Sequence, residues 1–242
     1  MDQFPTTRPF TNFDRIIRFE STAKSDYNGL TLALRRPYRD GLLANFAYSL
    51  GKVTDTVPDA TAVVPASSDD AKFPSNPANF NADKAPGIND QRHRFVFSGV
   101  WDLLRFRGES GWRKGLLDGW SLSWIATAAS GQPFSEAVTN DLNRDGNRRN
   151  DIVPGSRDAH RLPWSYNLDL RVAKRVPLAG RFDLVLIGEA FNLFDHDNIN
   201  AVRTGFYTYD VAHNILIPQA GFGTATGATD NRILQLAVKL EF

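Results

Sequence analysis

Residues 231–242 read NRILQLAVKLEF, and this stretch decides the fold class. A β-strand places successive side chains on opposite faces, so a period of two gives each face its own character. The odd and even positions here divide cleanly. One face carries Leu234, Leu236, Val238, Leu240 and Phe242, and the other carries Gln235, Ala237, Lys239 and Glu241. The end of the chain therefore predicts a β-strand with one apolar and one charged face.

The same alternation recurs along the whole chain, whereas no segment sustains the spacing of an amphipathic helix over three turns. Six further segments show it clearly and a seventh, residues 13–21, shows it weakly. The clear ones are residues 26–36, 42–53, 92–106, 120–128, 164–176 and 181–194. Eight candidate strands in sequence predict an all-β, antiparallel protein.

The connections between these strands differ in length according to side. Short turns occupy residues 36–41, 107–115 and 176–181, and all three fall on one side of the predicted sheet together with Phe242. The long polar segments, about 54–91, 130–162 and 195–231, fall on the other side with the link at 22–25. Compact soluble domains rarely carry several loops of this length, whereas transmembrane β-barrels have short turns on one side and long loops on the other.

Composition excludes several classes of protein. The 242 residues include 28 Lys and Arg against 27 Asp and Glu, and this balance gives no reason to expect a nucleic-acid partner. The absence of cysteine excludes a disulfide scaffold, a thiolate zinc site and a cysteine nucleophile. No apolar run reaches the roughly 18 residues of a membrane helix.

A soluble β-sandwich would show the same alternation, so two further features matter. Full charges stand in the middle of the polar faces, at Asp169, Arg171 and Glu189, where a watery lumen would solvate them. Aromatic residues crowd the strand ends, as the girdles of outer-membrane barrels do. They are Trp101, Trp120, Trp164, Tyr166, Phe194 and Phe242. Both features favour a membrane barrel.

Four motifs resemble those of TonB-dependent outer-membrane receptors of the Oar-like type, which carry an N-terminal carboxypeptidase-regulatory-like domain. They occur in the order of that family. They are FESTAKSDYNGL at 19–30, DLNRDGNRRNDIVPG at 141–155, GEAFNLFDH at 188–196 and RILQLAVKLEF at 232–242.

This resemblance implies a transmembrane β-barrel segment in the cell outer membrane, with short periplasmic turns and long extracellular loops. It implies energised uptake of a large solute such as a siderophore or a glycan, and no enzymatic activity. The implied partners are outer-membrane lipid and the barrel-assembly machinery, which would read the last strand ending at Phe242. TonB would act only through a plug domain, which the resemblance does not place in this chain.

Receptors of this family have about 22 strands, a signal peptide, a TonB box and a plug domain. The chain opens MDQFPTTRPF and offers eight candidate strands. We therefore expect residues 1–12 to be an irregular segment and residues 13–242 to be the C-terminal part of a receptor barrel. Two alternatives stay open: a self-contained small outer-membrane barrel, and a soluble all-β module that binds calcium or carbohydrate.

One loop has the composition of a metal site. Its candidate ligands are Asp141, Asn143, Asp145, Asn147 and Asp151, with Gly146 at the sixth position. Oxygen ligands at alternate positions with a glycine turn suit a structural Ca²⁺ ion, although an EF-hand would place Glu where this chain has Ile152. The alternative is a metal-free surface loop rich in Asx turns, with three arginines nearby that weaken the negative field.

No catalytic residues and no required cofactor are indicated. The four histidines, His93, His160, His196 and His213, lack the spacing of a zinc site.

Overall fold

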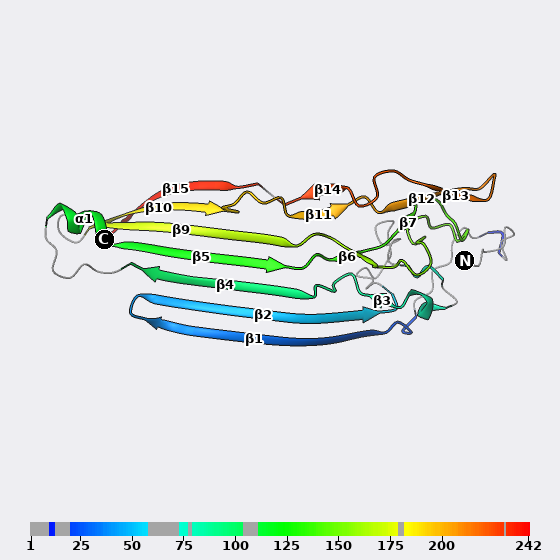
Figure 1. Cartoon of the computed structure of the whole chain (residues 1–242), viewed down its shortest axis with the longest axis horizontal. Helices are drawn as coiled ribbons and strands as arrows, with labels where there is room; N and C mark the ends of the chain where they lie inside the picture. Colours follow the sequence, from blue (N-terminus) through cyan, green and yellow to red (C-terminus); the bar gives the residue numbers. More distant parts are fainter. Residues whose placement is uncertain are drawn as a thin grey trace.

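The structure is a computed structural model that describes residues 10–12, 20–57, 73–76, 79–103, 111–178, 182–229 and 231–242. Seven long strands form one antiparallel sheet in which each strand pairs with the next along the chain (Figure 1). Their order is β1 (Ser25–Arg39), β2 (Leu42–Asp55), β4 (His93–Asp102), β5 (Trp120–Ala129), β9 (Ser165–Pro177), β10 (Asp183–Phe191) and β15 (Ile233–Glu241). The all-β, antiparallel prediction is confirmed.

The seven clearly alternating segments correspond to these seven strands, with ends that shift by a few residues. The weak eighth candidate lies mainly outside the described residues, because residues 13–19 are not among them. With 9 to 15 residues each, the strands are long enough for the 9–11 residues that a tilted membrane-spanning strand needs.

The register carries the apolar pattern of each strand onto its neighbour, because directly paired residues point to the same face. One row crosses six strands and contains only apolar residues and one glycine: Leu236, Gly188, Val172, Leu122, Trp101 and Leu42. A one-residue slip anywhere would move a strand's apolar residues to the polar face. The seven patterns thus agree on one apolar face and one polar face for the whole sheet.

Hydrogen bonds and ion pairs connect neighbouring strands across the polar face. Arg175 pairs with Asp183 at 3.0 Å and with Glu241 at 2.8 Å, and Arg171 lies 3.5 Å from Glu189. Arg175 on β9 is therefore paired with carboxylates on both β10 and β15 across this face.

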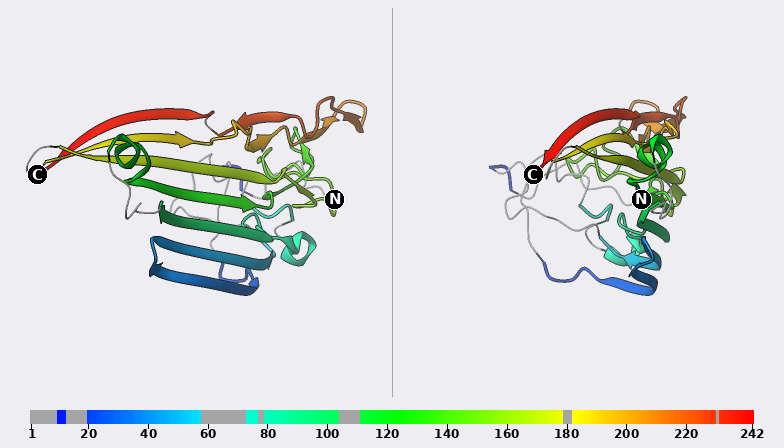
Figure 2. Two further views of the ribbon diagram at one scale, coloured as in Figure 1. Left: turned by 60° about the vertical axis from the view of Figure 1, so that its left-hand side comes forward. Right: turned by 90° about the vertical axis from the view of Figure 1, so that its left-hand side faces the viewer.

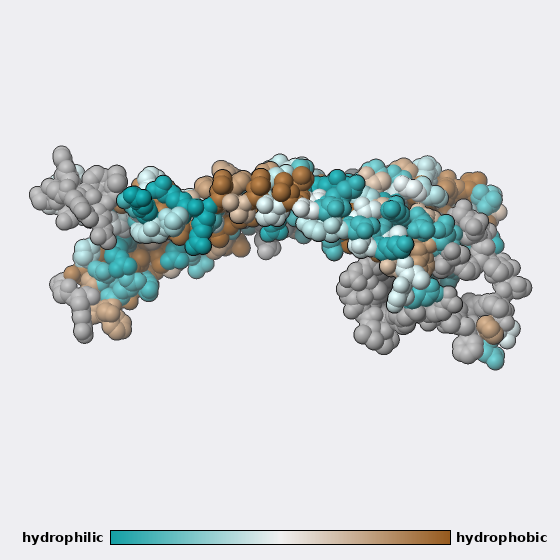
Figure 3. Space-filling view, turned by 90° about the horizontal axis from the view of Figure 1, so that it is seen from below, coloured by the Kyte–Doolittle hydropathy of each residue, from teal (hydrophilic) through white to brown (hydrophobic). Residues whose placement is uncertain are grey.

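Large side chains on the apolar face gather at both strand ends. Near the long loops Tyr48 stacks on Phe95 with ring centroids 4.5 Å apart, and Trp164 stacks on Tyr166 at 6.2 Å. Trp101 and Trp120 stand at the opposite strand ends. Figure 3 shows apolar residues over the middle of the strands and hydrophilic residues toward both ends.

Lys174 is a charged residue on the apolar face and lies directly opposite Trp120. Its ammonium group reaches the turn end of the strand, where the carbonyl oxygens of Leu116 and Asp118 accept its hydrogen bonds and the Trp120 ring lies 5.2 Å away. Long basic side chains commonly bury their stem in this way and deliver the charge to a polar edge.

The predicted sidedness of the connections is also confirmed. The β1–β2 turn is a two-residue connection in which Asp40 and Gly41 both have positive φ, at 54° and 81°. This is the type I′ geometry that fits the strand twist, and it favours Asp-Gly. The connection after β4 is longer than the turn expected at residues 107–115, because it contains helix α1 (Trp112–Leu117). No helix among the described residues is long and apolar enough to cross a membrane.

The long segments have more structure than the sequence predicts. They contain the 3₁₀ helix η2 (Phe80–Asp83) and eight short strands. These strands are β3 (Ala85–Pro86), β6 (Pro133–Phe134), β7 (Ala137–Val138), β8 (His160–Arg161), β11 (Ile199–Val202), β12 (Gly205–Asp210), β13 (Ile215–Pro218) and β14 (Ala225–Ala228). Long-range pairs such as β7 with β12 make a folded layer beyond the ends of the sheet.

The sheet is an open arc and its two edge strands, β1 and β15, lie far apart (Figure 2). In the end-on view the opening between them is much wider than the spacing of neighbouring strands. Because the described meander has an odd number of long strands, β1 and β15 run in the same direction, and direct pairing between them would be parallel.

The apolar face generates a first prediction. Leu236 is 89 % exposed in the middle of β15, and we expect it to contact lipid. A Leu236→Arg substitution should destabilise the inserted chain by about 2–4 kcal/mol, the cost of an arginine on the lipid face near the midplane. The matched control Gln235→Arg, one residue away on the polar face and opposite Glu189, should change little. Chain recovered in the outer membrane measures both, and equal losses would contradict the assignment of the faces.

Candidate functional site

The buried interior of the described chain is mostly polar and lies in the loop layer. Only four hydrophobic residues are fully buried, compared with sixteen polar or charged ones. All of the sixteen except Lys174 lie in the long loops or at the strand ends next to them. The candidate functional site is therefore this folded loop layer, which is seen at the right of Figure 1.

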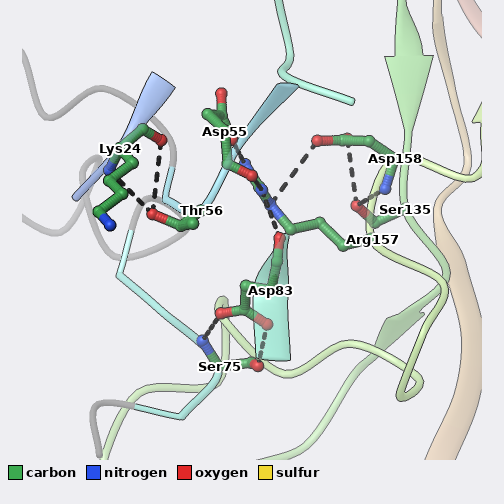
Figure 4. Close-up of polar contacts among 8 residues, drawn as sticks. All are labelled: Lys24, Asp55, Thr56, Ser75, Asp83, Ser135, Arg157 and Asp158. Carbon is green, nitrogen blue, oxygen red and sulfur yellow. Dashed lines mark hydrogen bonds and ion pairs between the residues drawn. The ribbon is translucent and has the colours of Figure 1, made fainter. Parts of the chain in front are cut away.

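Arg157 is the centre of the first polar cluster (Figure 4). Its guanidinium group forms an ion pair with the carboxylate of Asp55, at the end of β2. It also donates to the main-chain oxygens of Asp55 at 3.1 Å and Asp83 at 2.6 Å. One buried side chain from the second long segment thus holds the end of a wall strand and the first long segment together.

Two hydrogen-bonded pairs surround Arg157. The hydroxyl of Ser75 and its main-chain N–H both donate to the Asp83 carboxylate, the latter at 2.7 Å. The main-chain N–H of Asp158 donates to the Ser135 hydroxyl at 2.9 Å. Burial raises the pKa of the Asp158 carboxyl above its usual range, although the positive charge of Arg157 beside it works in the opposite direction. A small cleft of about 120 Å³ opens between these groups.

Asp90 is the centre of a second polar cluster and is completely buried. The two ion pairs, Arg157 with Asp55 and Arg161 with Asp90, are called the arginine clamps below. The Asp90 carboxylate accepts hydrogen bonds from the main-chain N–H of Val53 at 2.7 Å, from Arg92 at 2.8 Å and from Arg161. Burial alone would raise its pKa, but these donors outweigh burial and hold the pKa of Asp90 below its ordinary value of 3.8. Residues 53, 90 and 161 are thereby fixed to one another although they are far apart in sequence.

The predicted metal loop forms a tight turn in which side-chain oxygens accept hydrogen bonds from main-chain N–H groups. Asp141 accepts from the main-chain N–H groups of Asp145 at 3.1 Å and Gly146 at 2.9 Å. Asn143 accepts from the N–H of Asp145 at 2.9 Å, and Asp145 accepts from that of Asn147 at 2.7 Å. The structure therefore brings the first three candidate residues together around one turn.

Asp151, at the far end of the loop, is hydrogen-bonded to the turn through Asn143. One carboxylate oxygen accepts from the N–H of Asn143 at 3.3 Å, and the other has no hydrogen-bond partner. Burial and the negative charges of Asp141 and Asp145 raise the pKa of Asp151 to about 7. Asn147 is also buried, but its side-chain oxygen accepts from the N–H of Arg149 at 3.1 Å.

Within the part of the chain that the structure describes, no three His, Asp or Glu side chains are arranged to hold a metal ion by themselves. A cation in the 141–151 loop would therefore need amide and main-chain oxygens as well as carboxylates.

The four histidines lie in separate surroundings. His93 meets the Tyr48 hydroxyl at 2.9 Å, and the His196 ring lies edge-on to Tyr166. His160 lies 2.6 Å from Glu136, and His213 lies 2.7 Å from Asp210. Each of these contacts holds a histidine against a neighbouring side chain of the fold.

The two arginine clamps were not predicted from the sequence. Asp55 and Arg157 are 102 positions apart, and Asp90 and Arg161 are 71 apart. The one usable signal was the presence of charged residues directly beside strand ends, which does not identify their partners. Chemically the arrangement fixes loops in place.

The Arg157 clamp generates a second prediction. Removing one partner of a buried ion pair leaves the other charge uncompensated and typically costs about 3–5 kcal/mol. We expect Arg157→Gln to lower the free energy of local opening of residues 79–90 by an amount of this order, measured by amide hydrogen exchange. The control Arg39→Gln removes an exposed ion pair with Asp40 at the opposite end of the sheet and should leave these amides unchanged. Unchanged exchange in both variants would show that the clamp is unimportant.

Asp90 generates a prediction about acid. Its folded-state pKa lies below 3.8, so its contribution to stability is fully present above that value and is lost as the pH falls through the folded value. Protection of the Val53 amide, corrected for intrinsic exchange, should stay constant from neutral pH to about pH 5 and decline only below pH 3.8. Asp90→Asn should weaken protection at pH 5 and abolish this acid-dependent step. A step at the same pH in the variant would assign it to another carboxylate.

Comparison with known proteins identifies the family. The model of the outer membrane beta barrel domain family matches residues 2–162, which is about two thirds of the chain. No curated protein and no solved structure matches it. The match includes strands β1 to β5 and the second long segment as far as Arg161 in β8, and so contains both arginine clamps and the 141–151 loop. This chain belongs to the outer membrane β-barrel domain family, and its place is the outer membrane of the cell.

Proposed function

We propose that the chain is part of the barrel wall of a TonB-dependent outer-membrane receptor. Its long loops would form part of the outer mouth through which a large solute, such as a siderophore or a glycan, is taken up with energy from TonB. The observation that carries this proposal is the wide opening between the two edge strands of the sheet.

Backbone groups in lipid have no water to bind, so a spanning sheet must close on itself or continue. Edge strands β1 and β15 each pair on one side only among the described strands. Bacterial single-chain barrels have an even number of antiparallel strands, so an odd number must be added to these seven. A receptor of about 22 strands and a barrel of eight both satisfy that condition.

The shape of the sheet favours the larger barrel. An eight-stranded barrel would leave room for one strand between β1 and β15, and residues 13–21 are the candidate for it. The opening in Figure 2 is far wider than one strand spacing. The motifs at 19–30, 141–155, 188–196 and 232–242 support the receptor in particular. Membership of an outer-membrane family argues against the alternative of a soluble module.

The partners follow from this proposal. Lipid would cover the apolar face, and the barrel-assembly machinery would recognise β15 and the exposed aromatic residue Phe242. TonB would act through a plug domain supplied by the rest of the receptor, so this chain alone would not transport. No step in this role requires an enzyme active site or a nucleic acid.

A photo-cross-linking residue at Ala237, on β15, tests the proposal in the outer membrane of cells that make the protein. In a receptor, the cross-links of β15 should join β10 and a strand or plug segment outside residues 1–242. In a small closed barrel they should join β10 and residues 13–21 or β1 of the same chain, and that result would overturn the proposal.

The same probe at Ala47 on β2 is the matched control. Ala47 lies between Ala33 on β1 and Val96 on β4, so its cross-links should be confined to those two strands in either case. Cross-links from Ala47 to other segments would show that the sheet is not folded as described.

A further inference from the structure

Two neighbouring side chains of the 141–151 loop contain buried oxygen atoms without a partner. Among the described residues only three buried side-chain polar atoms lack a hydrogen bond, and two of them are Oδ1 of Asn150 and Oδ2 of Asp151. Asn150 is 4 % exposed and Asp151 is 1 % exposed. Buried polar groups are almost always paired, so this pair of acceptors needs an explanation such as an ion.

The orphaned oxygen of Asp151 belongs to a carboxylate that is hydrogen-bonded to the turn. The main-chain N–H of Asn143 donates to the other oxygen of the same carboxylate, and Leu142 provides a second main-chain hydrogen bond. Asn143 connects this carboxylate to Asp145, because the side-chain amide of Asn143 donates to Asp145 at 3.2 Å. A bound cation would neutralise the buried Asp151 carboxylate, whose second oxygen has no hydrogen-bond donor.

The three arginines of the loop lie at its surface. Arg144, Arg148 and Arg149 are all exposed, whereas Asn143, Asn147, Asn150 and Asp151 are buried. Water screens an exposed guanidinium group, so its attraction for a buried carboxylate is weak.

The other candidate ligands are held around the same turn by hydrogen bonds. Asp141, Asn143 and Asp145 are held by the main-chain N–H groups of residues 145–147, and Gly146 has a φ of 84°, which lets the chain turn sharply. A carboxylate or amide oxygen has two lone pairs, so one hydrogen bond leaves room for a metal–oxygen contact.

We propose that residues 141–151 bind one Ca²⁺ ion through side-chain oxygens of Asp141, Asn143 and Asp145, with Asp151 completing the site. Ca²⁺ accepts six to eight oxygen ligands in flexible geometry, and the seventh loop position commonly contributes its main-chain carbonyl, here that of Asn147.

The ion would fix the first long segment (about 54–91) to the second (130–162). The side-chain amide of Asn143 donates to the Ser75 carbonyl at 3.1 Å, and that of Asn150 donates to the Pro74 carbonyl at 2.9 Å. Both amides also donate to Asp145 Oδ2, at 3.2 and 2.9 Å. Ordering of the 141–151 loop is therefore transmitted to residues 73–76. This inference does not depend on the receptor assignment.

The test is calorimetric titration of CaCl₂ into the full chain, purified in detergent and freed of divalent ions with EGTA. We expect one Ca²⁺ per chain and no comparable heat with MgCl₂. Asp151→Asn keeps the size of the side chain and should weaken binding at least about tenfold, because ligand charge sets affinity in such loops. The control Asp26→Asn, on the exposed start of β1, should bind as the unmodified chain does.

Amide hydrogen exchange of the unmodified chain with Ca²⁺ or with EGTA provides the second measurement, and it needs no variant to fold. Protection should increase with Ca²⁺ in residues 141–151 and 73–76 and stay constant in β9. Absence of binding at millimolar Ca²⁺, or equal binding by Asp151→Asn and the unmodified chain, would overturn the proposal. If Asp151→Asn loses its strand signal in circular dichroism, Asp141→Asn replaces it, and the exchange result still decides.

Discussion

Backbone hydrogen bonding is the constraint on which the rest of this structure depends. In the hydrocarbon region each N–H and C=O group needs a protein partner, and the seven strands satisfy this requirement everywhere except at the outer edges of β1 and β15. Those two edges, with the odd number of described long strands, are the basis of our proposal that the sheet continues into a larger wall. The apolar face follows from the same constraint, because a strand that is paired on both sides has only its two faces left for lipid and water.

The loop layer differs from the sheet, because it buries polar groups and has few buried apolar side chains. Arg157 and Asp90 do so by placing opposite charges and main-chain groups at hydrogen-bond distance. Such clusters contribute less net stability than apolar packing of the same volume, but they tolerate few alternative arrangements, since each unpaired group is costly. A loop layer built in this way keeps a defined shape while remaining hydrophilic.

The sequence was sufficient for the wall and insufficient for the loops, and the reason is the range of the interactions. The alternation in residues 231–242 is a local property, and it predicted both the strand and its outward face. The same rule failed at Lys174, where a charge occupies an apolar position because its stem is long enough to reach the carbonyl of Leu116 at the turn end. Alternation gives no information on Arg157 and Asp55, because loop closure over 102 positions, not local pattern, brings them together.

The 141–151 loop lies between these cases. Its spacing of Asp and Asn residues predicted candidate oxygen ligands, and local hydrogen bonds alone explain why three of them are held around one turn. The sequence could not show that Asp151 would be buried with one oxygen unpartnered, since that burial comes from packing within the loop layer. Local pattern determined the residue types of the candidate site, and tertiary burial left the Asp151 oxygen without a partner. A functional loop on a barrel wall therefore depends on both ranges of interaction, whereas the wall itself requires only the shorter one.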